Sequence, residues 1–126
     1  MSLRTPLGRV RGLGSAKEGV THWWAQRLTA IALVPLILWF VVCLLSIAHA
    51  DYEAAVEWVS QPLNTVLLVV LLFSVFYHAQ LGMQVVIEDY VHAEGAKLIS
   101  LLLMKFILVL LGVSAVLAVL RIAFGG

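Results

Sequence analysis

The chain has 126 residues, of which 63% are hydrophobic and only 12% are charged, and its mean hydropathy is +1.05. Soluble domains average about 45–50% apolar and about 25% charged residues, so this composition excludes an ordinary soluble protein and indicates a membrane protein. The net charge of +1 gives no indication of nucleic-acid binding, and no nucleic-acid partner is expected. Cys43 is the only cysteine, which excludes an internal disulfide framework.

Three apolar runs follow one another along the chain, at about residues 28–48, 63–87 and 98–124. Each reaches the roughly 20 residues that cross about 30 Å of hydrocarbon. Backbone groups in lipid must find their partners within the segment, which only helices allow for single spans. We therefore expect one all-α membrane domain over 1–126, with transmembrane helices at about 27–49, 62–88 and 97–124.

The charges predict how this bundle lies in the membrane. Five basic residues precede the first span: Arg4, Arg9, Arg11, Lys17 and Arg27. The joint after the first span carries acids and no base: Asp51, Glu53 and Glu57. By the positive-inside rule the N-terminus is cytoplasmic, so residues 1–26 are expected to form a cytoplasmic arm and the second joint also faces inside.

The second apolar run contains an ionisable residue, His78, about nine residues or roughly 13–14 Å of helix from its inner end. Gly82 lies one turn further on, and Asp89 falls on the same helical stripe because eleven residues return to within about 20°. Gly82 leaves a flat notch where a planar group or another helix can approach the backbone. Tyr90 follows Asp89 at the predicted inner surface.

Two interpretations of His78 remain open on the residues alone. Ionisable residues inside a membrane are costly and are functional hypotheses by default, and a neutral imidazole is a standard axial ligand of haem iron. The alternative is a core histidine that hydrogen-bonds a neighbouring helix. The other histidines lie at expected helix ends: His22, His49 and His92. Leu36 and Phe106 are expected near the depth of His78, so a bis-histidine haem would take its second ligand from another chain.

Two segments carry a resemblance to a known family. "HAQLGMQVVIEDYV" (78–91) has a His, a Gly four residues on, and Asp-Tyr at eleven and twelve, while "GVTHWWAQRLTAIAL" (19–33) has an Arg followed by Thr-Ala. Both resemble the small hydrophobic membrane anchor of succinate dehydrogenase, which is respiratory complex II. The similarity covers essentially the whole chain, and it implies half of a heterodimeric haem-binding helix bundle.

The resemblance also implies roles for particular residues. It makes His78 an axial ligand of haem b, shared with a companion cytochrome b subunit. The notch at Gly82, one turn from His78, would then lie beside that haem. The resemblance places Arg27 near the haem propionates, which a guanidinium can bind in fork geometry. It makes Tyr90 a hydrogen-bond donor to a ubiquinone carbonyl, with Asp89 at the same site. It assigns no role to His22, His49 or His92.

The function implied is a membrane anchor of succinate:ubiquinone oxidoreductase in a bacterial cytoplasmic (inner) membrane, with the mitochondrial inner membrane as the alternative location. Electrons would pass from a flavoprotein subunit that holds FAD, through an iron–sulfur subunit, to ubiquinone at a site that this chain helps to line. The chain itself has no nucleotide motif and no cysteine cluster, so it is not expected to catalyse succinate oxidation alone.

Other functions fit parts of the pattern. The anchor of a quinol:fumarate reductase shares these features and runs the reaction in the other direction. A cofactor-free membrane packing or assembly protein would use His78 only as a hydrogen-bonding group, and a proton or solute carrier would use His78 and Asp89 as relays. Separately, Arg27 is also explained as a snorkelling anchor, and Tyr90 as part of the interfacial aromatic belt.

Overall fold

The computed structural model of the protein describes residues 15–125. These residues form helices and turns without any strand: α2 (Ser15–Ile47), α3 (Tyr52–Ser60), α4 (Pro62–Tyr90) and α5 (Glu94–Ala123). Three helical segments are long and apolar enough to cross a membrane, namely Val20–Ile47 in α2 and the whole of α4 and α5. The expected all-α fold with three membrane spans is confirmed.

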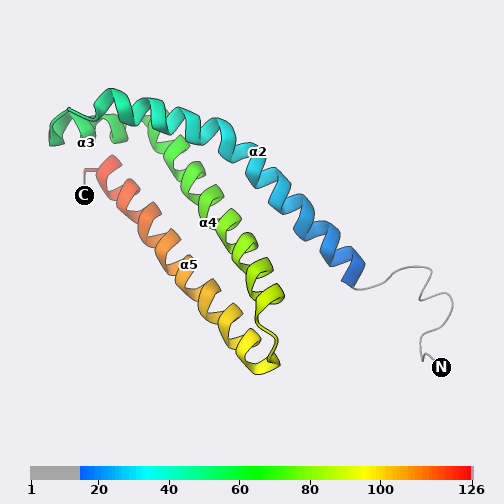
Figure 1. Ribbon diagram of the computed structural model, residues 1–126. Helices are drawn as coiled ribbons and strands as arrows, with labels where there is room; N and C mark the ends of the chain where they lie inside the picture. Colours follow the sequence, from blue (N-terminus) through cyan, green and yellow to red (C-terminus); the bar gives the residue numbers. More distant parts are fainter. Residues whose placement is uncertain (1–14, 126) are drawn as a thin grey trace, which may run out of the picture.

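Helix α4 is the central element of the molecule. It packs against both α2 and α5, while the short α3 contacts α4 and α5 at one end of the bundle (Figure 1). The turn between α4 and α5 lies at the other end, on the same side as the N-terminal part of α2. Consecutive spans therefore run in opposite directions, and six of the eight buried side chains in the described part of the chain belong to α4.

The first helix is longer than the apolar run that predicts it. Helix α2 begins at Ser15, so residues 15–26, which the sequence assigns to an arm, are helical, and residues 1–14 of that arm lie outside the described range. Pro35 lies inside α2, where its missing N–H removes one helical hydrogen bond. Figure 1 shows α2 curving past the N-terminal start of α4, beside α3.

The joint between the first two spans contains a short helix that the sequence does not predict. Asp51 caps α3, because its side chain accepts a hydrogen bond from the Ala54 N–H at 2.8 Å, as an N-cap aspartate does. The buried Asn64 then donates to the Trp58 carbonyl oxygen at 2.9 Å, which holds the start of α4 against the end of α3. Trp58 also stacks on Trp39 of α2, with ring centroids 5.7 Å apart.

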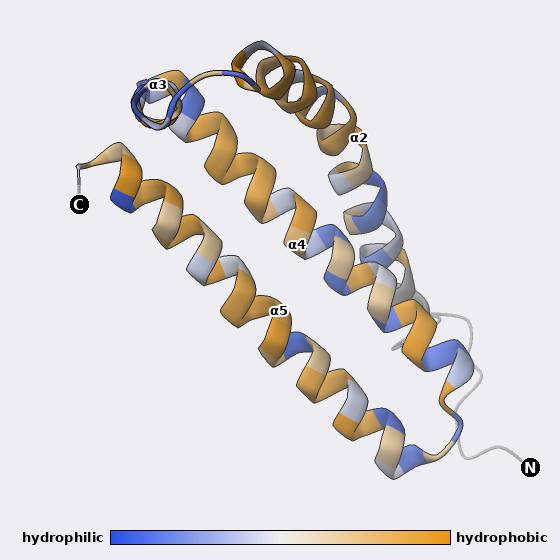
Figure 2. Cartoon of the chain, turned by 60° about the vertical axis from the view of Figure 1, so that its left-hand side comes forward, coloured by the Kyte–Doolittle hydropathy of each residue, from blue (hydrophilic) through white to orange (hydrophobic). Residues whose placement is uncertain are grey.

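The contact between α4 and α5 depends on a small residue. Phe76 of α4 lies against Gly112 of α5 so closely that a Cβ built at Gly112 would be 3.3 Å from the Phe76 ring. Small residues let membrane helices approach each other in this way, and the gain comes from close van der Waals packing. Figure 2 shows that most of α5 is hydrophobic, whereas hydrophilic residues mark the N-terminal part of α2 and the C-terminal half of α4.

Candidate functional site

His78 lies in the middle part of α4, half-buried, and it forms a hydrogen bond that joins α4 to α2. Its Nδ1 atom is 2.9 Å from Oγ1 of Thr29. Among the residues that the structure describes, this is the only hydrogen bond of the His78 side chain. The chain therefore engages one ring nitrogen of His78 and leaves the other, Nε2, without a partner among those residues.

Thr29 is held within its own helix as well. Its hydroxyl is 2.8 Å from the Ala25 carbonyl oxygen and 3.0 Å from that of Gln26. The contact places Thr29 level with His78, whereas the sequence predicts Leu36 at that depth. The prediction is wrong because it counts from the start of the apolar run, and α2 begins twelve residues earlier, at Ser15 rather than near residue 27.

Gly82 lies one turn beyond His78 on nearly the same side of α4. A Cβ built at Gly82 meets no other atom within 4 Å. The notch expected from the sequence is therefore open in the described part of this chain, in contrast to Gly112, which is covered by Phe76. A flat group coordinated by His78 would have room at this point of α4.

Polar side chains on the same face of α2 as Thr29 continue towards the N-terminus. His22 and Gln26 precede Thr29 by seven and three residues, a spacing that puts all three on one face of a helix. Nε2 of His22 and Oε1 of Gln26 are buried without a hydrogen-bond partner in the described part of the chain. A buried polar atom left unpaired costs about 1–3 kcal/mol, so this stripe lacks partners within the part of the chain that the structure describes.

Asp89 and Tyr90 form the end of α4. Both are exposed, Tyr90 to 77%, and neither side chain has a hydrogen bond to the described residues. Gln84 donates to Glu88 on the following turn at 2.9 Å, so the carboxylate next to Asp89 is already engaged. Tyr90 lies twelve residues from His78, or about 18 Å along the helix. The structure thus keeps the two predicted sites apart on one helix.

Arg27 is not brought next to His78. Its guanidinium carbon lies 5.1 Å from the centre of the Trp23 ring, one turn earlier in α2, and the residue is exposed. Arg27 is two residues from Thr29, so its side chain leaves α2 about 200° away from the side that faces His78. A cation over an indole ring in this way is a favourable surface contact.

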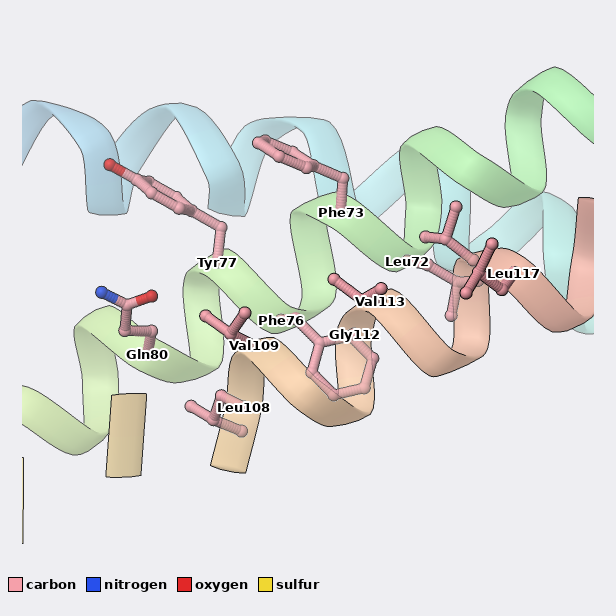
Figure 3. A pocket seen from close by; sticks show the side chains of 11 residues that line it. Leu72, Phe73, Phe76, Tyr77, Gln80, Leu108, Val109, Gly112, Val113 and Leu117 are labelled. Atoms are coloured by element: carbon pink, nitrogen blue, oxygen red, sulfur yellow. The ribbon is translucent and has the colours of Figure 1, made fainter. Parts of the chain in front are cut away.

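A cavity between α4 and α5 has a volume of about 360 Å³, and His78 is not among its lining residues. Phe76 and Gly112 meet in its wall, and only Tyr77 and Gln80 bring polar groups to it (Figure 3). Phe73 and Tyr77 stack along it with nearly parallel rings 6.0 Å apart. His78 does not line this cavity, so a group held by His78 would not lie in it.

The structure adds two residues to the candidate site: Thr29, which contacts His78, and Gln26, which lies on the same face of α2. Thr29 stands in the "RLTA" segment that carries the family resemblance, yet the sequence analysis assigns it no role, because a threonine in an apolar helix ordinarily bonds its own backbone. The only signal is its position in that segment. No group of three or more potential metal ligands occurs among the described residues.

The fold and site define a helical membrane protein with three spans, whose central helix carries a half-buried histidine held by the first span. Residues 1–112 match the family of succinate dehydrogenase/fumarate reductase transmembrane subunits. The chain is 34% identical over 116 residues to the succinate dehydrogenase hydrophobic membrane anchor subunit of Rickettsia bellii. This match covers 92% of this chain and 93% of that relative. The chain belongs to this family of transmembrane subunits, which confirms the resemblance seen in its sequence.

Two further relatives carry the same kind of name. The chain is 33% identical over 94 residues to the succinate dehydrogenase membrane anchor subunit of Reclinomonas americana, covering 72% of this chain and 78% of the relative. It is 28% identical over 86 residues to the succinate dehydrogenase hydrophobic membrane anchor subunit of Paracoccus denitrificans, covering 68% and 67% respectively.

Proposed function

We propose that this protein is the membrane anchor subunit of a succinate:ubiquinone oxidoreductase, and that the whole chain forms one anchor domain. The family and the names of its relatives support this function. Its partners are a companion cytochrome b subunit, an iron–sulfur subunit and a flavoprotein subunit that holds FAD. The membrane is the bacterial cytoplasmic membrane, with the N-terminus inside, as the charge distribution predicts.

The contact between His78 and Thr29 is the observation that carries the haem part of this proposal. A histidine that ligates a metal through one nitrogen ordinarily hydrogen-bonds a protein group through the other. In His78, Nδ1 has such a partner at 2.9 Å and Nε2 has none among the described residues. The open space at Gly82 adds room for a flat macrocycle against the backbone. These residues fit a haem b bound at this side of α4.

When bound, haem b supplies a one-electron redox centre within the membrane. In this chain His78 would hold the iron through Nε2, and Gly82 would leave room for the macrocycle beside α4. A second imidazole would come from the companion subunit, as the family resemblance implies, because the other histidines of this chain, His22, His49 and His92, lie near the ends of the helices. Arg27 points away from His78 in this chain and lies over Trp23, so it would bind a propionate only by leaving that ring.

The end of α4 is the proposed quinone contact. Tyr90 donates a hydrogen bond from its phenol to a carbonyl oxygen of ubiquinone, and Asp89 lies beside it to assist proton uptake from the inner aqueous phase. The exposure of both side chains and their lack of partners in the described chain support this role. The rest of the quinone pocket comes from the partner subunits.

The anchor of a quinol:fumarate reductase is the second candidate, because the matching family covers transmembrane subunits of both enzymes. The named relatives favour succinate dehydrogenase. The direction of turnover in membranes, measured with succinate and ubiquinone against quinol and fumarate, separates the two.

His78→Ala in the assembled complex tests the haem assignment. The variant lacks the proposed axial ligand, so the low-spin haem absorbance should be lost or strongly altered. His49→Ala is the matched control, because His49 is exposed just beyond the end of α2 at the other end of the bundle. A bis-histidine haem spectrum that is unchanged in His78→Ala would contradict the assignment.

A further inference from the structure

We infer that Thr29 is a positioning residue, which fixes the tautomer of His78 and thereby tunes the haem. This inference rests on the proposed function, because it concerns the ligand that His78 offers. It starts from the three contacts of a single hydroxyl group. Oγ1 of Thr29 lies 2.8 Å from the Ala25 carbonyl oxygen, 3.0 Å from the Gln26 carbonyl oxygen and 2.9 Å from Nδ1 of His78.

Counting hydrogens assigns a direction to each of these contacts. A threonine hydroxyl has one proton to donate and two lone pairs that accept. The two carbonyl oxygens can only accept, so the hydroxyl proton is directed to them and is shared between them. The lone pairs of Oγ1 then face Nδ1, and the contact is a hydrogen bond only if His78 carries its proton on Nδ1 and donates it to Thr29.

This direction determines what Nε2 can do. A neutral imidazole carries one proton, so a proton on Nδ1 leaves Nε2 with a free lone pair. The opposite tautomer would place an N–H at Nε2, where no described residue accepts it, and would leave His78 unable to ligate iron through that atom. The tautomer that Thr29 selects is therefore the one that a metal ligand needs.

The local structure of α2 explains why a threonine can do this reliably. A threonine in a helix places its hydroxyl against the carbonyl of the preceding turn, and Thr29 does so. The same rotamer aims the remaining lone pairs outward at the α4 surface. Burial keeps water from replacing the contact, because Thr29 and His78 are both half-buried within the membrane-spanning segments.

The hydrogen bond also has an electronic consequence. An Nδ1–H that donates to an acceptor makes the imidazole a more basic ligand, which stabilises the ferric over the ferrous state. Loss of the bond should therefore raise the midpoint potential of the haem. It should also weaken haem retention by about 10- to 100-fold, the usual cost of removing a group that orients a metal ligand.

Thr29→Val tests this in the purified complete complex, because valine keeps the branched shape and deletes only the hydroxyl. We expect a higher haem midpoint potential in a redox titration, a changed low-spin electron paramagnetic resonance spectrum and a lower haem-to-flavin ratio. Thr29→Ser retains the hydroxyl and should return all three readouts to near the wild-type values. A hydrogen bond that only packs α2 onto α4 would leave the potential unmoved.

Thr65→Val is the matched control, because Thr65 also directs its hydroxyl to backbone carbonyls, at 2.6 Å and 3.1 Å, but near the start of α4. It should leave the haem unaltered. The inference is overturned if Thr29→Val keeps the wild-type potential, if Thr29→Ser shifts it as far as Thr29→Val, or if Thr65→Val shifts it equally. These outcomes are separate from a failure of the haem assignment, which His78→Ala tests alone.

Discussion

Two sides of helix α4 differ in how far the rest of the chain covers them. One side is packed against α5, and the other carries an uncovered glycine and a histidine with one unpaired nitrogen. Phe76 and His78 are two residues apart and so point to nearly opposite sides of the helix. On the first side, Phe76 fills the space above Gly112 of α5. On the second, a Cβ built at Gly82 would contact no side chain and no other helix within 4 Å, and Nε2 of His78 has no partner in the described chain.

The glycines on the α5 side and on the His78 side of α4 have opposite effects on packing. At Gly112 the missing side chain admits a neighbour from the same chain, which closes the α4–α5 hairpin. At Gly82 it admits nothing from the described part of this chain. The side of α4 at Gly82 and His78 is therefore suited to contact a ligand or a partner subunit.

Replacing each of the two glycines by leucine, in separate variants, tests whether the two sides of α4 differ in this way. Gly82→Leu should lower haem content sharply, because overpacking against a bound group costs about 1–3 kcal/mol, or about 5- to 150-fold in affinity. The anchor itself should still insert and assemble, since no atom of the described chain lies near that position. Haem-to-flavin ratio and the thermal stability of the complex measure the two effects.

Gly112→Leu is the control for that substitution. It should lower the thermal stability of the complex, because the Phe76 ring already lies 3.3 Å from a Cβ at this position. Its direct effect on the haem should be smaller, because it acts on the far side of α4. Equal haem loss in the two variants, at equal stability, would show that Gly82 is not beside the haem.

The three spans are predictable from the sequence because composition and length leave few alternatives for an apolar run of this size. Helix α3 is not predicted, because only nine residues form it, between two longer apolar runs. Asp51, its N-cap, is one of three acids in this joint, but the sequence analysis uses these acids only to orient the bundle in the membrane. Hydropathy alone does not distinguish a short surface helix from a loop.

The candidate site residues can be proposed from the sequence, but the contacts between helices at the site cannot. His78, Gly82, Asp89 and Tyr90 lie on one helix, so helical geometry and family resemblance suffice to relate them. Thr29 requires knowledge of how α2 sits against α4, which depends on where α2 begins and how it crosses its neighbour. The same knowledge is needed to see which side of α2 faces His78, and hence that Arg27 leaves the helix on the side away from it.

A smaller effect is expected at the end of α4, where the described chain makes no hydrogen bond to the side chain of Tyr90. Tyr90→Phe keeps the ring and deletes the donor, so it removes a hydrogen bond of about 0.5–1.5 kcal/mol. Ubiquinone reduction by succinate should fall about 2- to 10-fold, while succinate oxidation with a soluble acceptor continues. Haem spectra should stay unchanged, since Tyr90 is about 18 Å along the helix from His78.

Slower quinone reduction with an unchanged haem spectrum would show that the quinone contact at Tyr90 is separate from the haem site at His78. Aromatic packing at the membrane interface does not need the phenol oxygen. Wild-type quinone kinetics together with wild-type inhibitor binding in Tyr90→Phe would therefore assign Tyr90 to the interfacial aromatic belt.

The smallest effect should follow from Arg27→Leu, because Arg27 leaves α2 on the side away from His78. Its contact in this chain, the exposed face of Trp23 at 5.1 Å, is worth about 0.5–1 kcal/mol, and four other bases still precede the span to orient it. If Arg27 pairs with a propionate, the haem potential should shift, but by less than in Thr29→Val. Arg27→Lys keeps the charge and loses the planar fork, so it should recover part of that shift. Should potential, haem content and quinone kinetics all match the wild type in Arg27→Leu, then Arg27 serves only as a membrane anchor, and the proposed haem contacts of this chain are those of His78 and Gly82 on α4.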